Sequence, residues 1–162
     1  MEGACGKILT TEDPNVVLKK VYRRNRPQQR SCSLRAEAQA TMQECMRNLC
    51  VQEKLDLLYV PRAWDAEKHS YKMDRIEVDK PLEVTATLDA GVLKELRRFY
   101  RAAMAQGIFP LDYELYLQRD GRVAMVDFDK FSVWNKEGTI TFPWGVTTDM
   151  KVIRDQYPYL LE

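Results

Sequence analysis

The sequence predicts an α+β protein, in which short strands and helices occupy separate stretches of the chain. Two helical stretches stand among several runs of β-branched and aromatic residues, and these elements do not alternate regularly. A doubly wound parallel sheet would need more crossover helices. The 162 residues contain no internal repeat or Gly/Ser linker, and this length fits one domain with its own core.

The first half of the chain carries three predicted strands and one helix. A strand is expected at 16–22, where "VVLKKVY" follows a turn in "TTEDPN". Apolar residues at helical spacing then predict a helix at about 34–49, with Ser33 as its N-cap. Further strands are predicted at 56–64, closed by a proline, and at 69–78.

The second half begins with the clearest helix, predicted at 88–106 with Thr87 as a cap. Gly107 stands where a helix often ends. A hairpin is expected at 114–128, and a short helix near 147–156. One apolar stripe marks the long helix: Val92, Leu96, Phe99 and Ala103.

Composition limits the classes of function. The chain is 45% hydrophobic and 30% charged with a net charge of +1, which argues against nucleic-acid binding by bulk charge. No apolar run reaches the roughly 20 residues that span a bilayer, and no secretory signal is apparent at the N-terminus. Four irregularly spaced cysteines and the lone His69 favour free thiols in a reducing, cytoplasmic compartment over a zinc site. The single histidine also weakens any Ser-His-Asp or Cys-His nucleophile.

The hairpin contains the first candidate site. A two-residue turn at Asp120-Gly121 would place Glu114 opposite Asp127, with Cβ atoms roughly 4.5–5.5 Å apart. Like charges at that spacing destabilise a strand pair, and a hard cation such as Mg²⁺ would compensate for them. The alternative is that the strand pairing ends before this pair and that both carboxylates are solvated.

The segment "VAMVDFDKF" resembles the metal-binding segment of the protein-kinase-like fold, where Asp-Phe-Gly follows a short apolar strand. Asp129 stands where that family has glycine. "EGACGKIL" is similar to the end of the kinase glycine-rich loop, with Gly3 and Gly6 as its glycines and Ile8 on the strand that follows. Such glycines let backbone N–H groups approach phosphates closely, whereas the alternative is a flexible N-terminus.

Other parts of this resemblance imply an ATP site. "VVLKKV" resembles the strand with the phosphate-binding lysine, which would be Lys19, or Lys20 in a shifted register. Glu37, eighteen residues after Lys19, matches the glutamate that pairs with it. In "YKMDRIEVDKPL", Met73 would be the gatekeeper, and the backbone of Asp74 to Ile76 would meet the adenine edge. The alternative reading leaves Lys19 and Glu37 in solvent.

The resemblance therefore implies one kinase-like domain over 1–162. It would have a small antiparallel sheet with one helix at about 1–77 and a strongly reduced C-terminal lobe at about 78–162. The match itself covers roughly 1–131, and the activation segment and substrate-binding helices of the family are missing.

The catalytic loop departs most from the family pattern. In the register set by Asp127, Glu114 falls at the metal-binding asparagine and Phe109 at the catalytic aspartate, so the usual base is absent. Asp112 is the nearest acid and could accept the proton of a substrate hydroxyl only if the loop were rebuilt. Metal binding by Asp127 and Glu114 is thus better supported than catalysis by Lys19 and Asp112.

We therefore expect an atypical kinase or pseudokinase that binds ATP and Mg²⁺ and acts through a protein partner. Truncated kinase-like proteins of this kind suggest by analogy a viral or effector origin. The alternative is an α+β interaction module without nucleotide binding, such as a kinase mimic that inhibits or scaffolds a partner. Separately, residues 14–36 contain seven basic residues and no acid, and they form either a solvated loop or a phosphate-recognising patch. The basic residues are Lys19, Lys20, Arg23, Arg24, Arg26, Arg30 and Arg35.

Overall fold

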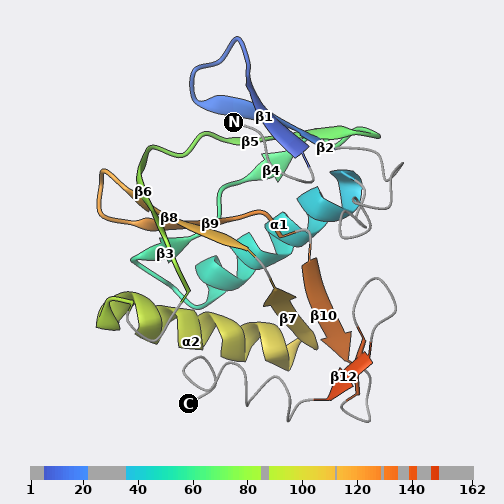
Figure 1. Cartoon of the computed structure of the whole chain (residues 1–162), viewed down its shortest axis with the longest axis vertical. Coiled ribbons are helices and arrows are strands. Elements are labelled where there is room, and N and C mark those ends of the chain that lie inside the picture. The colour runs from blue at the N-terminus through green and yellow to red at the C-terminus, as the bar shows by residue number, and fades with distance from the viewer. Residues whose placement is uncertain are drawn as a thin grey trace.

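The computed structural model describes most of the chain and confirms the α+β class. The described residues are 6–21, 36–84, 88–111, 113–128, 130–134, 139–141 and 147–149. They form three four-stranded sheets and two helices. Figure 1 shows the first sheet at one end of the molecule, the second sheet in the middle and α2 on the far side of it.

The first sheet is antiparallel, with the strand order β1-β2-β5-β4. Its members are β1 (Gly6–Thr10), β2 (Val16–Val21), β4 (Ala63–Trp64) and β5 (Ser70–Asp74). The strand predicted at 16–22 is therefore confirmed over β2. β1 and β2 form a hairpin in which Ile8 lies opposite Lys19 and Thr10 lies opposite Val17.

The second sheet has the order β3-β9-β8-β6 and contains the predicted hairpin. Its strands are β3 (Leu58–Tyr59), β6 (Val78–Leu82), β8 (Glu114–Gln118) and β9 (Val123–Val126). β3 pairs in parallel with β9, and the other pairs are antiparallel. Pro81 lies within β6, and an edge strand tolerates its missing N–H donor.

Two of the predicted strands are each divided in the structure. The stretch 56–64 forms β3 in the second sheet and β4 in the first, with Pro61 between them. The stretch 69–78 ends its pairing in the first sheet at Asp74, and β6 begins at Val78. In both places the chain passes from one sheet to the other. Each predicted strand is therefore interrupted where its pairing partner changes.

The third sheet lies in the C-terminal part and has the order β12-β11-β10-β7. It consists of β7 (Ile108–Leu111), β10 (Lys130–Trp134), β11 (Thr139–Thr141) and β12 (Thr147–Asp149). β12 contradicts the helix predicted near 147–156 over its first three residues, because Thr147–Asp149 pair with Thr139–Thr141. The remainder of that predicted helix lies outside the described residues.

Both predicted long helices are present, as α1 (Ala36–Gln52) and α2 (Ala90–Ala105). The cap of α2 is Asp89, whose carboxylate accepts the N–H groups of Gly91 and Val92 at 3.0 and 3.3 Å. Asp89 therefore performs the capping role predicted for Thr87, which lies outside the described residues, as does Ser33. Neither of the two described helices is both long enough and apolar enough to cross a bilayer.

Two clusters of buried apolar residues fill the interior. The larger cluster joins α1, α2, β3 and the β8–β9 hairpin, and its most buried members include Met46, Leu96, Phe99, Leu115 and Met125. The smaller cluster lies between the first sheet and the hairpin, and its buried members are Val21, Ala36, Ala40, Ala63, Tyr71, Met73 and Val126. The hairpin therefore separates the two clusters, and this explains why all four residues of β9 are buried.

The hairpin turn is longer than predicted, and the register differs by one residue. Its loop spans Arg119 to Gly121, with the Gly121 N–H donating to Gln118 O at 3.1 Å and Gly121 at φ 88°. The Asp120 carboxylate accepts the Arg122 N–H at 2.9 Å, which fixes this three-residue turn. Glu114 consequently lies opposite Val126, and the predicted pairing with Asp127 is wrong.

Candidate functional site

A buried lysine meets an aspartate between the first sheet and the hairpin. The Lys19 ammonium on β2 forms an ion pair with the Asp127 carboxylate, which follows β9. The side chain of Lys19 is 10% exposed and that of Asp127 is 31% exposed. The pair is thus reachable by solvent from the side of the carboxylate, and it connects segments 108 residues apart.

Alternation along β2 explains why Lys19 points inward. Val17, Lys19 and Val21 share the face that meets the smaller cluster, whereas Lys20 is exposed on the other face. Lys19 is therefore the lysine of the "LKK" run that points into the interior. The alternative register, in which Lys20 would point inward, is excluded. A buried ammonium needs a counter-charge, and Asp127 supplies one.

Asp127 has an unusual backbone conformation, with φ at 72°. In a regular strand Val126 and Phe128 would face the same side, but Val126 packs in the smaller cluster and Phe128 in the larger one. The left-handed conformation at Asp127 permits this change of side. Phe128 is 2% exposed and stacks on Tyr113 at 5.8 Å between ring centroids. Strained backbone that the surrounding core holds in place is common at functional sites.

Tyr116 and Glu114 extend the same site along β8. The Tyr116 hydroxyl donates to a Glu114 carboxylate oxygen at 2.7 Å. Burial, then the hydrogen bond and charge of Glu114, raise the pKa of Tyr116 to about 12, with Asp127 raising it further and Lys19 opposing the rise. The charges of Glu114, Asp127 and Lys19 thus all act on the Tyr116 hydroxyl.

The corrected register removes the reason to expect a metal ion between two opposed carboxylates. Glu114 and Asp127 are not directly opposed, and Asp127 has Lys19 beside it, so the strand pairing itself requires no cation. Among the described residues, no three His, Cys, Asp or Glu side chains gather as a candidate metal site. Mg²⁺ commonly uses one or two carboxylates together with waters and phosphates of the ligand. Metal binding by Asp127 and Glu114 therefore stays a prediction.

A cavity of about 240 Å³ lies at the turn between β1 and β2. Its lining includes Thr10 and Val17, which face each other across the hairpin, and Arg75, which follows β5. Val17 shares its face with Lys19, and two residues along a strand correspond to roughly 6.6 Å. The cavity itself lies at the turn end of the hairpin, and neither Lys19 nor Asp127 lines it.

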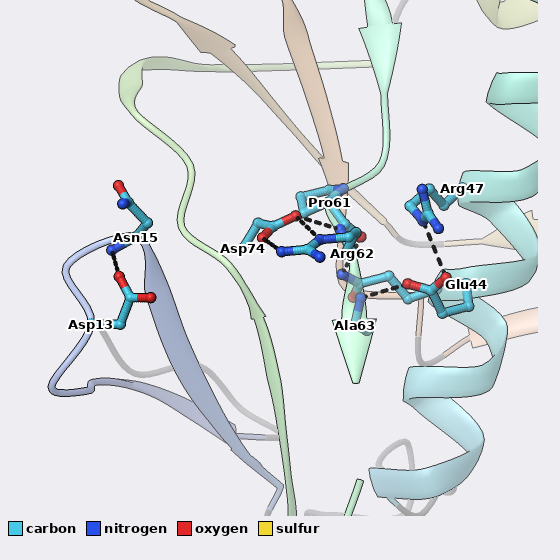
Figure 2. Close-up of polar contacts among 9 residues, drawn as sticks. Asp13, Asn15, Glu44, Arg47, Pro61, Arg62, Ala63 and Asp74 are labelled. Carbon is cyan, nitrogen blue, oxygen red and sulfur yellow. Dashed lines mark hydrogen bonds and ion pairs between the residues drawn. The ribbon is translucent and has the colours of Figure 1, made fainter. Parts of the chain in front are cut away.

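Backbone hydrogen bonds attach this turn to the segment after β5. The Arg75 N–H donates to Asn15 O at 2.8 Å. The Asp13 carboxylate accepts the Asn15 N–H at 2.9 Å (Figure 2). The Arg75 guanidinium also donates to Pro14 O at 3.4 Å. The β1–β2 turn and the segment after β5, which both contribute to the lining of the cavity, are therefore bonded to each other.

The segment predicted to contact adenine lies at the end of β5 and just after it. Several of its groups already bond to or pack against other parts of the protein. Met73 is 5% exposed and lies opposite both Val17 and Ala63, while Ile76 packs against the same smaller cluster. The Asp74 N–H donates to Arg62 O at 3.1 Å. The Asp74 carboxylate accepts two bonds from the Arg62 guanidinium, at 3.0 and 3.1 Å, as Figure 2 shows.

Side chains of α1 bond to the backbone of residues 61–63, the segment that contains Arg62. Gln43 Nε2 donates to Pro61 O at 2.9 Å, and Glu44 accepts the Ala63 N–H at 2.7 Å. Arg47 in turn donates to Glu44 at 3.1 Å (Figure 2). These contacts position α1 against the first sheet.

The other predicted site residues that the structure describes lie in different parts of the molecule. Gly6 is buried on β1, where an added Cβ would approach Lys20 O to 2.5 Å, so strand pairing by itself requires this glycine. Ile8 lies opposite Lys19, and Glu37 is exposed in the first turn of α1. Gly3 and Asp112 lie outside the described residues. Phe109, which replaces the catalytic aspartate in the predicted register, is 1% exposed in the larger cluster.

The two described cysteines are free thiols, as expected. Burial, followed by the charge of Glu95, raises the pKa of the Cys50 thiol to about 12. Such a thiol is protonated at neutral pH and is therefore unreactive. Cys50 is a member of the larger core cluster rather than of the candidate site.

Tyr116 is the site residue that the sequence argument missed. The period-two alternation of "ELYLQ" contained the signal, because it places Glu114 and Tyr116 on one face and two leucines on the other. That face could be assigned to a site only once the neighbouring sheet was known. No family model matches this chain, and no curated protein is detectably similar to it in sequence.

Proposed function

We propose that this chain is a nucleotide-binding protein that holds the phosphates of a Mg²⁺–ATP complex at Lys19 and Asp127, on a reduced kinase-like fold. The single observation that carries the proposal is the ion pair between a buried ammonium on a sheet and a carboxylate in left-handed backbone conformation at the end of an adjacent hairpin. An ammonium is a strong phosphate ligand, and a carboxylate is a preferred Mg²⁺ ligand.

The chemistry of the pair suits a ligand that carries both charges. A phosphate would take the place of Asp127 beside the buried Lys19, and Mg²⁺ would take the place of Lys19 beside Asp127, so that neither charge loses its partner. The cavity beside Val17 would receive the non-phosphate part of the ligand. Its volume of about 240 Å³ is below the range for whole drug-sized ligands, which fits a site for one ring system.

Phosphoryl transfer and a protein partner are separate predictions. Transfer requires a base, for which Asp112 is the candidate, and the binding geometry neither requires nor supplies one. Nucleotide binding is compatible with an active atypical kinase and with a pseudokinase alike.

Thermal unfolding with and without ATP and Mg²⁺ tests the binding proposal. Ligand at 100 times its dissociation constant should stabilise the chain by about 2.7 kcal/mol. Lys19→Met and Asp127→Asn should each abolish most of this shift. Lys20→Met is the matched control, because Lys20 adjoins Lys19 but lies exposed on the opposite face.

Two results would sink the proposal. One is an unchanged melting temperature for the wild type at millimolar MgATP. The other is a ligand-dependent shift that is equal in Asp127→Asn, Lys20→Met and the wild type. If the shift behaves as expected, autophosphorylation by the wild type and by Asp112→Asn then separates an enzyme from a pseudoenzyme, and equal incorporation would exclude Asp112 as the base.

A further inference from the structure

The first sheet has an inner face that packs on the rest of the molecule and an outer face that points away from it. Val21, Tyr71 and Met73 on the inner face pack in the smaller cluster with residues of α1 and the hairpin. The residues that alternate with them along the strands point to the opposite side. The described residues of this outer face are Lys7, Leu9, Val16, Leu18, Lys20, Trp64, Ser70, Lys72 and Asp74.

A row of large apolar side chains crosses the outer face. Leu9 on β1 lies opposite Leu18 on β2. Lys72 on β5 follows in the same row, and Trp64 on β4 ends it. Leu9 is 37% exposed, and Leu18 and Trp64 are half-buried. The solvent face of an antiparallel sheet is normally polar, so apolar residues gathered on it are typical of a surface that contacts a partner.

Two lysines lie directly opposite each other beside this row. Lys7 on β1 faces Lys20 on β2, two positions along the strands from Leu9 and Leu18 respectively. Like charges at directly opposed positions destabilise a strand pair. Neither lysine takes part in the ion pairs found among the described residues. An anion bound between the two ammonium groups would therefore relieve their repulsion.

The charges and the side chains of the outer face discriminate between kinds of partner. The same face of a second copy would bring two lysine pairs together, and these repel each other. A nucleic-acid strand would need aromatic platforms for its bases, but the Trp64 ring lies under the Arg62 guanidinium, 4.8 Å from its centroid. A lipid surface would need apolar side chains that project from the fold, whereas Leu18 and Trp64 are half-buried. A protein segment with carboxylates beside apolar side chains suits both features of the face.

We propose that the outer face of the first sheet is a docking surface for an acidic segment of a partner protein. One carboxylate of the segment binds between Lys7 and Lys20. An apolar side chain two positions further along an extended segment packs on Leu9 and Leu18, because two residues of a strand span roughly 6.6 Å in both chains. This inference is independent of nucleotide binding, since Lys19 points to the inner face.

Fluorescence anisotropy with two labelled peptides tests the docking surface. One probe is a short peptide of alternating glutamate and leucine, and the other alternates lysine and leucine. The wild type should bind only the acidic probe, and added salt should weaken this binding because it screens surface charges. The double variant Lys7→Glu with Lys20→Glu should bind the acidic probe about tenfold or more weakly and should bind the basic probe instead. This double variant keeps a like-charge pair, so its strands meet the same repulsion as those of the wild type.

Single variants separate docking from stability. Lys20→Glu replaces the repelling pair by an attractive one, so it should raise the melting temperature while it weakens binding of the acidic probe. Leu9→Ala should weaken the acidic probe by about threefold or more, because it removes apolar contact area. Lys94→Glu and Val51→Ala are the matched controls, since both residues are exposed on the helices and neither belongs to the outer face.

The possible results have distinct meanings. If the wild type binds neither peptide, or if it and the double variant bind the acidic probe equally, the docking surface is overturned. If a single-stranded oligonucleotide or phosphatidylserine vesicles bind the wild type more tightly than the acidic probe and lose this binding in the double variant, the partner is a phosphate-bearing one and the acidic protein segment is wrong. A dimer in sedimentation experiments that Leu9→Ala dissociates would assign the face to a second copy instead. No probe peptide contains a nucleotide, so failure of the proposed function would leave these results unchanged.

Discussion

At the scale of single residues, the candidate site depends on the unequal environments of two charges. Lys19 is almost fully buried, whereas a third of the Asp127 side chain meets solvent. Desolvation opposes a buried charge much more than a partly exposed one. The two members of this ion pair should therefore contribute differently to stability when each is removed.

Asp127→Asn should lower the free energy of unfolding by about 2 kcal/mol, because it removes the negative charge beside a buried ammonium. The asparagine tolerates the left-handed conformation, so backbone strain does not enter the comparison. Lys19→Met should cost less than about 1 kcal/mol, since a methionine suits the buried position and water can solvate the remaining carboxylate. Urea denaturation at pH 7 measures both values. Equal costs, or a larger cost for Lys19→Met, would contradict this account of the pair.

At the scale of elements, α2 is fixed to the second sheet by a buried carboxylate. Glu95 is 8% exposed and accepts the N–H groups of Asp56 and Leu57, at 2.5 and 2.9 Å. The Leu57 carbonyl in turn accepts the Val123 N–H at 2.6 Å, at the start of β9. One helix side chain thus holds the loop that leads into β3, and β3 supports the hairpin of the candidate site.

Glu95→Ala should destabilise the protein by about 2 kcal/mol, because two backbone donors would lose their acceptor in a largely buried place. Glu95→Gln retains a carbonyl oxygen and should cost about half as much. Lys94→Ala, at an exposed neighbouring position of α2, provides the control. Chemical denaturation ranks the three variants, and a cost for Glu95→Ala no greater than that of the control would show that the contact has no structural weight.

At the scale of the whole molecule, the larger core cluster joins segments from both halves of the chain. α1, α2, β3 and the β8–β9 hairpin all contribute buried side chains to it. The smaller cluster then connects the hairpin to the first sheet. We therefore expect one cooperative unfolding transition rather than two.

Leu96→Ala should lower the free energy of unfolding by about 3 kcal/mol, since Leu96 is fully buried at the centre of the larger cluster. The loss should appear as a single transition that coincides when followed by circular dichroism and by fluorescence. Val51→Ala is the control, because Val51 is 64% exposed and its truncation should change stability by less than about 0.5 kcal/mol. Two separate transitions in the wild type or in Leu96→Ala would instead indicate two independent units.

The sequence by itself determined the α+β class, both long helices, the strand around Lys19 and the hairpin before Asp127. These features follow from local periodicity and turn chemistry, which a single chain segment displays. Sequence periodicity could not show that 56–64 and 69–78 each divide between two sheets, because partner strands far along the chain decide where pairing stops. It also placed a helix where β12 pairs with β11.

Tertiary structure alone decided the composition of the site. The sequence paired Glu114 with Asp127 across a two-residue turn, but the Asp120 carboxylate and Gly121 form a three-residue turn that shifts the register by one. Asp127 instead meets Lys19, from which it is separated by 108 residues, and Glu114 meets Tyr116. A one-residue shift reverses the facing of every side chain along a strand, so small differences in a turn determine which charges come together.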